Sequence, residues 1–523
     1  MQDPTKYPIG VQDFEKIRME GYVYVDKTAF IQQLVTSGGY YFLSRPRRFG
    51  KSLLLSTLSA YFEGKRKLVK DLAIAEHAKK WPKHPVLYLD LSNEKYTEPA
   101  VLEAVLNRRL NAWEEQYGRR TDEVTLSLRF SGVIQRAFEQ TKKQVVILID
   151  EYDKPLLQSL DNEPLRESYR ATLQAVYGNL KTCDKYIRFA MLTGVTRFSK
   201  LSVFSGLNNL KDISMFAEYA AICGITEQEL DTYLRAGVET LAQRCKISVV
   251  EAKERLKRRY DGYRFEEGAE NVYNPFSLLS ALDEKKFKDY WFATGTPTFL
   301  AEMLAREKYD LGNLTNRAIA EVRFNTLDTL RTNPLPILYQ SGYLTLDHRD
   351  EDGDYYLRFP NEEVECSFLQ VLLPYYAHKK DEDSDALLKS MTAQVRAGKP
   401  ESFMLELQAL LADTPFEKSE AGETYFRNVL LIIFRLLGFY CEVEHALAGG
   451  RSDVVIKTAQ YIYVLELKVD QSAEKALQQI EEKEYAAPYA ADKRKLFKIG
   501  VNFSSAKKKM DEWQVVAVEP AAS

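Results

Sequence analysis

A glycine–lysine–serine triplet between two apolar segments constrains the fold of this chain more than any other feature. The run Tyr40-Tyr-Phe-Leu43 precedes Arg45-Pro-Arg-Arg-Phe-Gly-Lys-Ser52, and an apolar helical stretch begins at Leu53. A strand, a loop and a helix in this order place backbone N–H groups and the positive end of a helix dipole against a phosphate. The segment predicts a phosphate-binding loop, and the alternative is a chance Gly-Lys-Ser at a helix start.

Each part of this loop has an expected role. Lys51 is expected to reach the β- and γ-phosphates of a nucleotide, and the Ser52 hydroxyl to ligate Mg²⁺. The loop departs from the pattern G-x-x-x-x-G-K-[ST] at its start, where Arg45 replaces the first glycine. The predicted cofactor-binding residues of the loop are Arg45, Pro46, Arg47, Arg48, Phe49, Gly50, Lys51 and Ser52.

A second motif follows about 100 residues later, where the apolar run beginning at Val145 ends in Asp150 and Glu151. Next to a phosphate loop, Asp150 is predicted to hold Mg²⁺ through water, and Glu151 to polarise the attacking water. A buried strand with surface acids at its tip is the alternative. Both motifs occur in the order that nucleotide hydrolysis requires, and this favours the functional interpretation.

A third strand-like run, Phe189-Ala-Met-Leu192, leads into Thr193-Gly-Val-Thr-Arg197. A polar residue at a strand tip beside the nucleotide, here Thr193, is a candidate to sense the γ-phosphate. Arg197 is a candidate to neutralise charge in the transition state. The alternative for Arg197 is an ordinary exposed arginine after a strand.

The N-terminal part resembles the AAA-ATPase-like family of bacterial proteins over roughly residues 5 to 225. This resemblance implies ATP rather than GTP as the nucleotide, and it implies that an arginine at the first loop position is normal. It also suggests that the Tyr24–Thr28 segment lies near the adenine. The matching segments are Tyr7-Pro-Ile-Gly-Val-Gln-Asp-Phe14, Tyr24-Val-Asp-Lys-Thr28, Arg45–Leu53, Leu148-Ile-Asp-Glu-Tyr-Asp153 and Thr193–Arg197.

Near the C-terminus, Asp453 opens one apolar run, and Glu466 and Lys468 stand in the next, Tyr461-Ile-Tyr-Val-Leu-Glu-Leu-Lys-Val469. Alternation along a strand places Glu466 and Lys468 on the same face. If the two runs pair as a hairpin, all three residues converge. Two carboxylates can hold a hard divalent cation that activates water and binds a phosphate, and a lysine can stabilise the developing charge. An exposed hairpin with ordinary charges is the alternative.

This region resembles the PD-(D/E)XK nuclease superfamily over roughly residues 420 to 510. The resemblance places Asp453, Glu466 and Lys468 on the acid and E-x-K positions, with Asp453 and Glu466 as metal ligands. It places Glu423 on the preceding helical acid and Gln479 on the following helical glutamine. Ser452 stands where the superfamily often has proline. Such domains also decay into binding modules, so catalytic competence is a separate question from fold.

The predicted fold class is α/β in three parts. Residues 1–225 should form a doubly wound phosphate-loop domain, 226–401 a chiefly helical middle region, and 402–523 an α/β nuclease-like domain. Within the middle region, a helix before the run Leu338–Leu346 and Tyr355–Pro360 suggests either a winged helix or a plain helical lid. The segment Tyr260-Asp-Gly-Tyr-Arg-Phe265 resembles a family landmark, and its aromatic density is typical of core contacts.

Bulk properties limit the remaining alternatives. The net charge of −3 neither supports nor excludes nucleic-acid binding, because a basic cleft can lie on an acidic body. Five cysteines without a CxxC pair argue against a disulfide framework or a zinc site and predict a reducing compartment. The longest apolar run, Val429–Phe434, is too short to cross a bilayer, and no signal core opens the chain. We expect a cytoplasmic protein without membrane segments.

The leading functional hypothesis is an ATP-binding and ATP-hydrolysing protein coupled to a metal-dependent nuclease, with ATP and Mg²⁺ as cofactors and nucleic acid as partner. The main alternative is a nucleotide-dependent regulatory or scaffold ATPase whose C-terminal domain binds nucleic acid or protein without cleavage. A third possibility is a protein-remodelling ATPase with a vestigial nuclease domain. Oligomerisation is compatible with all three hypotheses.

Overall fold

The computed structural model describes residues 5–77, 81, 83–197, 203–204, 207–292, 298–321, 333–377, 381–412, 421–439, 441–445, 453–489, 492–507 and 509–518. Within these ranges the side chains at 76–77, 298–299, 381–382, 412, 421–427, 442–445 and 453 lie outside the description. The chain divides into two compact units, one of residues 1–291 and 318–361, the other of residues 292–317 and 362–523. The three-domain division drawn from the sequence stays a prediction.

A parallel sheet lies at the centre of the first unit, with the strand order β2-β3-β4-β1-β5. The strands are β1 (Tyr40–Ser44), β2 (Val86–Asp90), β3 (Val145–Asp150), β4 (Ile187–Gly194) and β5 (Lys211–Asp212). Every residue of β3 is buried, as expected for a parallel strand that is covered on both faces. The register aligns Ser44 with Gly194 and Asp90 with Asp150, so the carboxyl ends of the strands lie along one edge.

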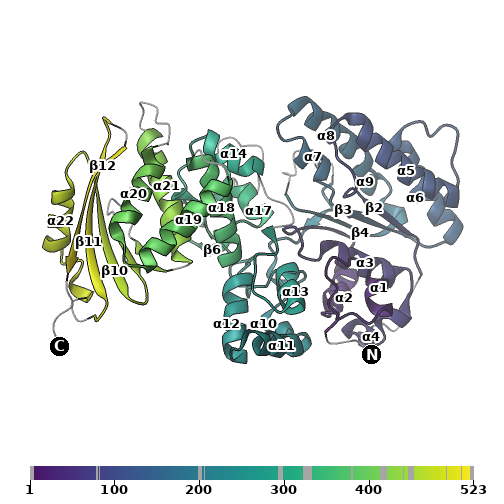
Figure 1. The fold of residues 1–523 in the computed structure, drawn as a ribbon. Coiled ribbons are helices and arrows are strands. Elements are labelled where there is room, and N and C mark those ends of the chain that lie inside the picture. The colour runs from purple at the N-terminus through teal and green to yellow at the C-terminus, as the bar shows by residue number, and fades with distance from the viewer. Residues whose placement is uncertain are drawn as a thin grey trace. The chain divides into compact units, whose positions relative to one another are not determined.

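Helices cover both faces of this sheet. Figure 1 shows α1, α2 and α3 on one face and α5, α6 and α8 on the other. This arrangement confirms the doubly wound α/β fold predicted from the sequence. The elements are α1 (Phe14–Met19), α2 (Thr28–Ser37), α3 (Lys51–Phe62), α4 (Ala73–His77), α5 (Pro99–Tyr117), α6 (Leu126–Thr141), α7 (Lys154–Gln158), α8 (Glu163–Tyr177) and α9 (Asn179–Thr182), with 3-10 turns η1 (Arg66–Val69), η2 (Asp184–Tyr186) and η3 (Ala217–Tyr219).

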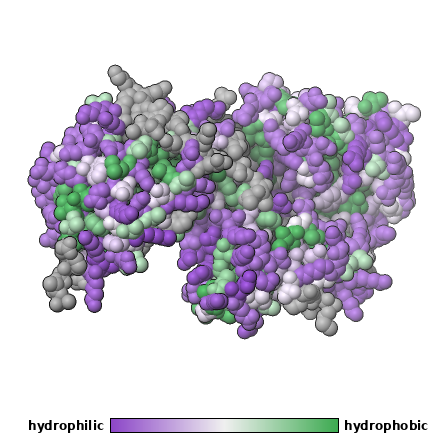
Figure 2. Space-filling view, viewed as in Figure 1, coloured by the Kyte–Doolittle hydropathy of each residue, from purple (hydrophilic) through white to green (hydrophobic). Residues whose placement is uncertain are grey.

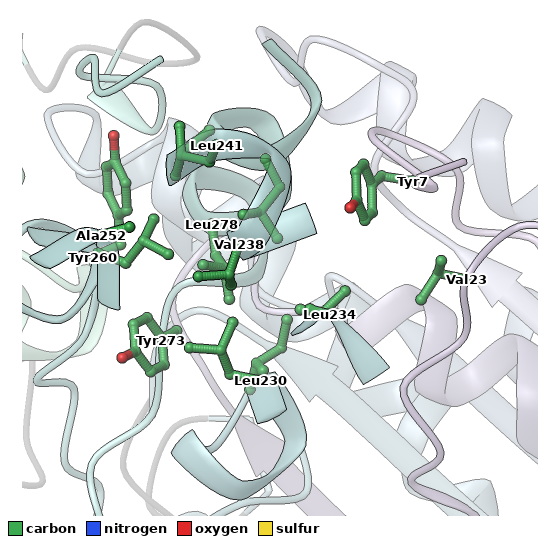
Figure 3. Packing of buried hydrophobic residues seen from close by; sticks show 14 of the residues in the cluster. Tyr7, Val23, Leu230, Leu234, Val238, Leu241, Ala252, Tyr260, Tyr273 and Leu278 are labelled. Atoms are coloured by element: carbon green, nitrogen blue, oxygen red, sulfur yellow. The ribbon is translucent and has the colours of Figure 1, made fainter. Parts of the chain in front are cut away.

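A helical subregion follows the sheet, and its core includes residues from the start of the chain. Its helices are α10 (Glu227–Tyr233), α11 (Arg235–Cys245), α12 (Val249–Tyr260) and α13 (Pro275–Glu284). Figure 3 shows Tyr7 and Val23 beside the apolar side chains of this cluster. A Cβ atom added at Gly237 would lie 2.1 Å from the Tyr7 hydroxyl oxygen, so this helix must carry a glycine where Tyr7 approaches. The N-terminal segment therefore joins the helical subregion to the sheet.

A short helix and a hairpin complete the first unit: α17 (Leu335–Ser341), β6 (Thr345–Arg349) and β7 (Tyr355–Arg358). In a DNA-binding winged helix, the helix before the hairpin enters a groove of the DNA. Here the residues from Leu335 to Gln340 are all buried, so α17 has no free face to offer. The hairpin turn is also acidic, from Asp350 to Asp354. Burial and charge therefore both argue against DNA reading by α17 and this hairpin.

The second unit contains a mixed sheet with the order β12-β11-β10-β9-β8, in which only β10 and β11 are parallel. Its strands are β8 (Glu442–His445), β9 (Asp453–Lys457), β10 (Tyr461–Val469), β11 (Lys495–Ser504) and β12 (Lys509–Val518). Its helices are α14 (Thr298–Arg306), α15 (Asn313–Asn316), α18 (Glu362–Ala377), α19 (Asp381–Arg396), α20 (Pro400–Ala412), α21 (Ala421–Gly438) and α22 (Ala473–Glu482), with the 3-10 turn η5 (Ala487–Tyr489).

Helix α22 forms the crossover between β10 and β11, because two parallel strands need a long connection. The helix lies close to the sheet at Gly500, where an added Cβ atom would be 2.2 Å from the Ala473 carbonyl oxygen. Figure 2 shows a mainly hydrophilic face with small, separated hydrophobic areas. Among the described residues no helix combines the length and apolarity of a membrane span. All five cysteines are free thiols.

Candidate functional sites

The phosphate loop connects the end of β1 to the start of α3. Gly50 precedes Lys51, the first residue of α3, in the left-handed conformation with φ of 93°, which favours glycine. No heavy atom lies within 4 Å of a Cβ atom built at Gly50, so the loop is open at this point. Arg48 is also left-handed, with φ of 67°. The free N–H groups at the start of α3 therefore open onto space that an anion can occupy.

Lys51 reaches back across the loop. Its side chain is buried, and its Nζ donates to the carbonyl oxygens of Arg45 at 2.9 Å and Pro46 at 3.0 Å. Both partners are neutral carbonyl groups, so a phosphate could replace them as a stronger acceptor for the ammonium. The structure thus places the predicted lysine at the predicted loop.

Arg45 has a structural environment that its sequence position did not indicate. Its guanidinium is buried and donates to the carbonyl oxygens of Ser44, Ser214, Tyr219 and Ala220. Burial lowers the pKa of this guanidinium from its ordinary value. The side chain of Arg45 is therefore occupied by protein groups, and only its main chain lines the loop.

The other loop residues differ in exposure. Phe49 is buried, whereas Arg47 and Arg48 are exposed, and Ser52 is half-buried in the first turn of α3. The Arg47 carbonyl oxygen accepts a hydrogen bond of 3.1 Å from the Trp291 indole N–H, and the Arg48 guanidinium lies over the Phe276 ring. Pro46 lies against Gly342, where an added Cβ atom would be 2.6 Å from the proline Cβ. Residues from the middle of the chain thus hold the loop on several sides.

Acidic groups gather at the end of β3, as the sequence predicted. Asp150 is buried, and its carboxylate accepts hydrogen bonds from the Thr193 hydroxyl at 2.6 Å and the Tyr88 hydroxyl at 3.4 Å. Glu151 follows in the left-handed conformation with φ of 48°, an uncommon one for a non-glycine residue. Burial raises the pKa of Glu151, and the positive charge of Lys51 opposes that rise. Asp150, Glu151 and Thr193 therefore form one cluster beside Lys51.

Asp153 belongs to this cluster, although no role was predicted for it from its motif. One carboxylate oxygen accepts from the main-chain N–H groups of Val195 at 3.0 Å and Thr196 at 2.6 Å, and from the Thr196 hydroxyl at 2.5 Å. The Gly194 backbone passes so close that an added Cβ atom would be 2.7 Å from Asp153. Asp153 therefore fixes the segment that leads to Arg197. Its position in the Asp-Glu-Tyr-Asp segment, directly after the predicted acids, is the sequence feature that could have pointed to this role.

Arg197 lies beside the end of β5. Its guanidinium forms an ion pair of 2.7 Å with Asp212, and its backbone N–H donates to the Gln340 side chain at 2.8 Å. The side chain is mostly buried, in contrast to an ordinary exposed arginine. Arg197 is thus held near the loop edge of the sheet with its charge balanced by Asp212.

An apolar pocket of about 650 Å³, including its opening, adjoins Gly50. The walls come from the N-terminal segment, the start of α3, the segment before α10, and α13. The lining residues are Pro8, Val23, Tyr24, Val25, Lys27, Phe49, Gly50, Leu53, Leu54, Thr57, Ile222, Cys223, Gly224, Ile225, Pro275 and Leu279.

In the second unit, strand β10 and helix α22 bring Glu466, Lys468 and Gln479 together. The Lys468 Nζ donates to Glu466 Oε1 at 2.9 Å and also to the Gln479 side-chain oxygen. Glu466 is almost fully buried. Gln479 in turn donates to the Tyr485 hydroxyl at 3.5 Å, a contact that the sequence analysis missed because no spacing rule marks it. The contact between Glu466 and Lys468 confirms that they share one face.

Asp453 lies directly across from Glu466 in the antiparallel β9–β10 pair. Positions that face each other in such a pair share a face of the sheet. The side chain of Asp453 lies outside the described residues, as does that of Glu423, whose backbone belongs to α21. Among the side chains that are described, no three His, Cys, Asp or Glu residues form a metal-sized group. The hairpin pairing expected from the sequence is present.

Comparisons with known proteins agree with this architecture. Residues 8–204 match the family described as predicted AAA-ATPase, and residues 421–513 match the PD-(D/E)XK nuclease superfamily. A protein of Azotobacter chroococcum mcd 1, described as an uncharacterized protein in the vnfD 5' region, is 34% identical over 514 residues, covering 95% of this chain and 96% of the relative.

Among solved structures, the Aeropyrum pernix ORC2 protein, described as ADPNP-ADP complexes, matches at 11% identity. The match covers 68% of this chain and 97% of that chain at a TM-score of 0.27, which is too low to support an argument. The sequence matches do not have this weakness, because one relative aligns over nearly the whole length of both proteins. The chain belongs to the AAA-ATPase-like family and carries a C-terminal domain of the PD-(D/E)XK nuclease superfamily.

Proposed function

We propose that this protein binds and hydrolyses ATP in its first unit and is a metal-dependent nuclease in its second. The observation that carries the ATPase proposal is the cluster of Lys51, Asp150, Glu151 and Thr193 at the edge of the parallel sheet. Open α/β sheets bind ligands at the carboxyl ends of their strands. We keep the domain boundaries 1–225, 226–401 and 402–523 as part of this proposal.

The loop and the acids have complementary parts in the proposed ATPase. The main chain of residues 45–50 and the N-terminus of α3 would bind the phosphates, and Lys51 would move from loop carbonyls to the β- and γ-phosphates. Ser52 and Asp150 supply the oxygen ligands that Mg²⁺ prefers. When bound, Mg²⁺ would neutralise phosphate charge. Water would attack the γ-phosphorus and release ADP and phosphate, with Glu151 accepting the hydrogen bond from that water.

Two groups near the loop edge of the sheet would respond to the γ-phosphate. The Thr193 hydroxyl donates a hydrogen bond to Asp150, so a change at the metal would reach strand β4 through this bond. Arg197 would neutralise transition-state charge only after leaving Asp212, because that carboxylate now balances its charge. Arg47 is exposed on the loop and could contact phosphate without breaking an ion pair among the described residues.

The apolar pocket beside Gly50 is the proposed site of the adenine ring. It continues directly from the phosphate loop, and Val23, Tyr24, Val25 and Lys27 form part of its wall. Apolar walls suit a purine base, and Lys27, the charged residue of the wall, is already paired with Glu229 at 2.7 Å. This arrangement supports the placement of the Tyr24–Thr28 segment near the adenine.

For the second unit, the proposed catalytic group is the cluster on β9, β10 and α22. Asp453 and Glu466 would hold a divalent cation, which when bound would activate water and bind the scissile phosphate. Lys468 would stabilise the developing negative charge, with Gln479 holding its ammonium in place. Glu423 on α21 is proposed as a further acid. The observation that supports this assignment is the burial of the Glu466 carboxylate and its hydrogen bond with Lys468 on the same strand.

One experiment tests both activities. Purified protein would be incubated with labelled DNA and RNA substrates, with Mg²⁺ or Mn²⁺, with and without ATP, while phosphate release and cleavage are measured. We expect metal-dependent phosphate release and metal-dependent cleavage of at least one nucleic acid. Phosphate release without any cleavage would favour the alternative, in which the C-terminal domain binds nucleic acid or protein without cutting it. No phosphate release would refute the ATPase proposal.

A further inference from the structure

The turn Tyr260–Phe265, which joins α12 to the following segment, touches the phosphate loop with two aromatic rings. The Phe265 ring lies 4.0 Å from the Arg45 guanidinium carbon. The Phe49 ring meets Tyr263 at 4.7 Å and Phe265 at 5.6 Å between centroids, edge to face in both cases. All four side chains are buried. This turn was a sequence landmark without a mechanism, and the proposed ATPase chemistry does not use it.

The turn itself is firmly held. Gly262 has φ of 100°, and an added Cβ atom would be 2.0 Å from the Pro360 carbonyl oxygen. The Arg264 N–H donates to the Thr345 hydroxyl at 2.7 Å, and that hydroxyl donates back to the Arg264 carbonyl oxygen at 3.0 Å. The turn is therefore fixed to strand β6, and a shift of the hairpin would move the aromatic rings.

Arg45 transmits this contact to the lysine that the ATPase proposal requires. The Arg45 side chain is held by backbone carbonyls on one side and by Phe265 on the other. Its own carbonyl oxygen is one of the two that accept from Lys51. A displaced Arg45 would displace the oxygen that fixes the Lys51 ammonium. An arginine at the first loop position can make this connection, whereas the glycine usually found there has no side chain to do so.

We propose that Phe265 is a positioning residue of the ATP site: through Arg45 and Phe49 it holds the phosphate loop in its nucleotide-binding shape, so that the helical middle region sets nucleotide affinity. This inference rests on the proposed ATP binding. It assigns a function to the arginine that stands in place of the first loop glycine, because Arg45 is the contact between the loop and the Tyr260–Phe265 turn. Phe265 itself touches no nucleotide in this scheme.

The test compares Phe265→Leu with Phe287→Leu in the full-length chain. Phe287 packs against the core of the helical subregion, so its variant controls for a general loss of packing. The affinity for AMP-PNP with Mg²⁺ would be measured by calorimetry, together with KM, kcat and the melting temperature. We expect Phe265→Leu to weaken AMP-PNP binding about tenfold, a change of about 1.4 kcal/mol. Phe287→Leu and the conservative Phe265→Tyr should stay within about twofold of wild type.

A double-mutant cycle tests whether Phe265 acts on the phosphate loop through Arg45. Arg45→Lys keeps the positive charge but loses the planar group that bonds several carbonyls and stacks on a ring. If the two residues act together, Arg45→Lys combined with Phe265→Leu should bind AMP-PNP no more weakly than the worse single variant. Fully additive losses would overturn the connection through Arg45.

The AMP-PNP affinities of the variants and of the wild-type chain decide whether Phe265 has the proposed role. If Phe265→Leu binds AMP-PNP as wild type does, or loses affinity only as much as Phe287→Leu, then Phe265 has no positioning role and the inference is wrong. If the wild-type chain binds no nucleotide, the proposed ATPase fails and the inference falls with it. The wild-type titration therefore separates the two failures before any variant is measured.

Discussion

The two candidate sites are built in opposite ways. The phosphate-loop site takes its groups from the ends of β1, β3 and β4, and its support from residues as distant in sequence as Phe265 and Gly342. The nuclease-like cluster takes Glu466 and Lys468 from one strand and Gln479 from the next helix. The first site is thus assembled by tertiary contacts, and the second by strand alternation and one crossover.

The two central lysines differ in the same way. Lys51 donates to neutral carbonyl groups, whereas Lys468 is paired with the buried carboxylate of Glu466. Removal of Lys51 would leave two neutral carbonyl oxygens without this donor. Removal of Lys468 would leave a buried charge without this partner, which is costly. The effect of a lysine on activity therefore need not match its effect on stability. The following predictions test this comparison between the two sites.

The largest effect is expected at the nuclease-like cluster. Asp453→Ala and Glu466→Ala should lower metal-dependent cleavage at least about 1000-fold, because each removes a metal ligand. Lys468→Ala should lose cleavage but still bind metal, and it should lower the free energy of unfolding by about 1–3 kcal/mol. Cleavage, Mn²⁺ titration and chemical denaturation measure these changes. ATPase activity should survive all three substitutions.

The neighbouring glutamines of α22 offer a matched control for that result. Gln479 binds Lys468, whereas Gln478 is exposed beside it on the same helix. Gln479→Ala should reduce cleavage, and Gln478→Ala should not. Equal cleavage by both variants would contradict the proposed role of Gln479.

Lys51→Ala should reduce ATP hydrolysis about 1000-fold, since it removes the cation that would stabilise the terminal phosphates. In contrast to Lys468→Ala, it should change the free energy of unfolding by less than about 1 kcal/mol. The exposed Lys70→Ala serves as control. Phosphate release and denaturation in parallel check both statements. Unchanged cleavage in Lys51→Ala would mean that the two activities are independent, and altered cleavage would mean that ATP gates the nuclease.

Glu151→Gln should lower ATP turnover by a few hundredfold while leaving nucleotide affinity within about threefold, because the amide cannot polarise water as a carboxylate does. Calorimetry with ATP and a steady-state phosphate assay separate the two quantities. Glu163→Gln, at a strongly exposed position, is the control. Normal turnover in both Glu151→Gln and Lys51→Ala would refute the assignment of this site.

The smallest effect concerns Asp261, a buried acid of the Tyr260–Phe265 turn. Burial raises its pKa from 3.8 to about 6, with Lys257 and Arg358 opposing the rise and Glu227 adding to it. Among the described residues its Oδ1 atom accepts no hydrogen bond. The folded chain therefore binds this proton more tightly than the unfolded chain, and stability falls as pH rises from about 4 to 6.

Asp261→Asn removes this titration. Above pH 6 the variant should be more stable than wild type by up to about 3 kcal/mol, the equivalent of a shift of about two pKa units. The difference should shrink toward zero as the pH falls to about 4. Thermal denaturation across this pH range measures the effect, with the exposed Asp283→Asn as control. A difference that does not depend on pH would contradict the assigned cause.

The parts of both sites that depend on local pattern could be predicted from the order of the residues alone. A strand before the Gly-Lys-Ser triplet and a helix after it follow from the sequence, and the structure has β1 and α3 there, although α3 already begins at Lys51 rather than at Leu53. The apolar run before Asp150 is a buried strand, and alternation puts Glu466 beside Lys468. These features were predictable because residue spacing within one element fixes which side chains are neighbours.

The segments that hold these groups from far along the chain could not be predicted in this way. Strand β4 lies between β1 and β3, and this order lets Thr193 bond Asp150 and lets Asp153 fix the segment before Arg197. The Ser214 and Tyr219 carbonyls around Arg45 and the ring of Tyr263 on Phe49 come from segments far along the chain. No local pattern encodes such contacts, because they depend on how the strands are ordered and how the helices pack against them.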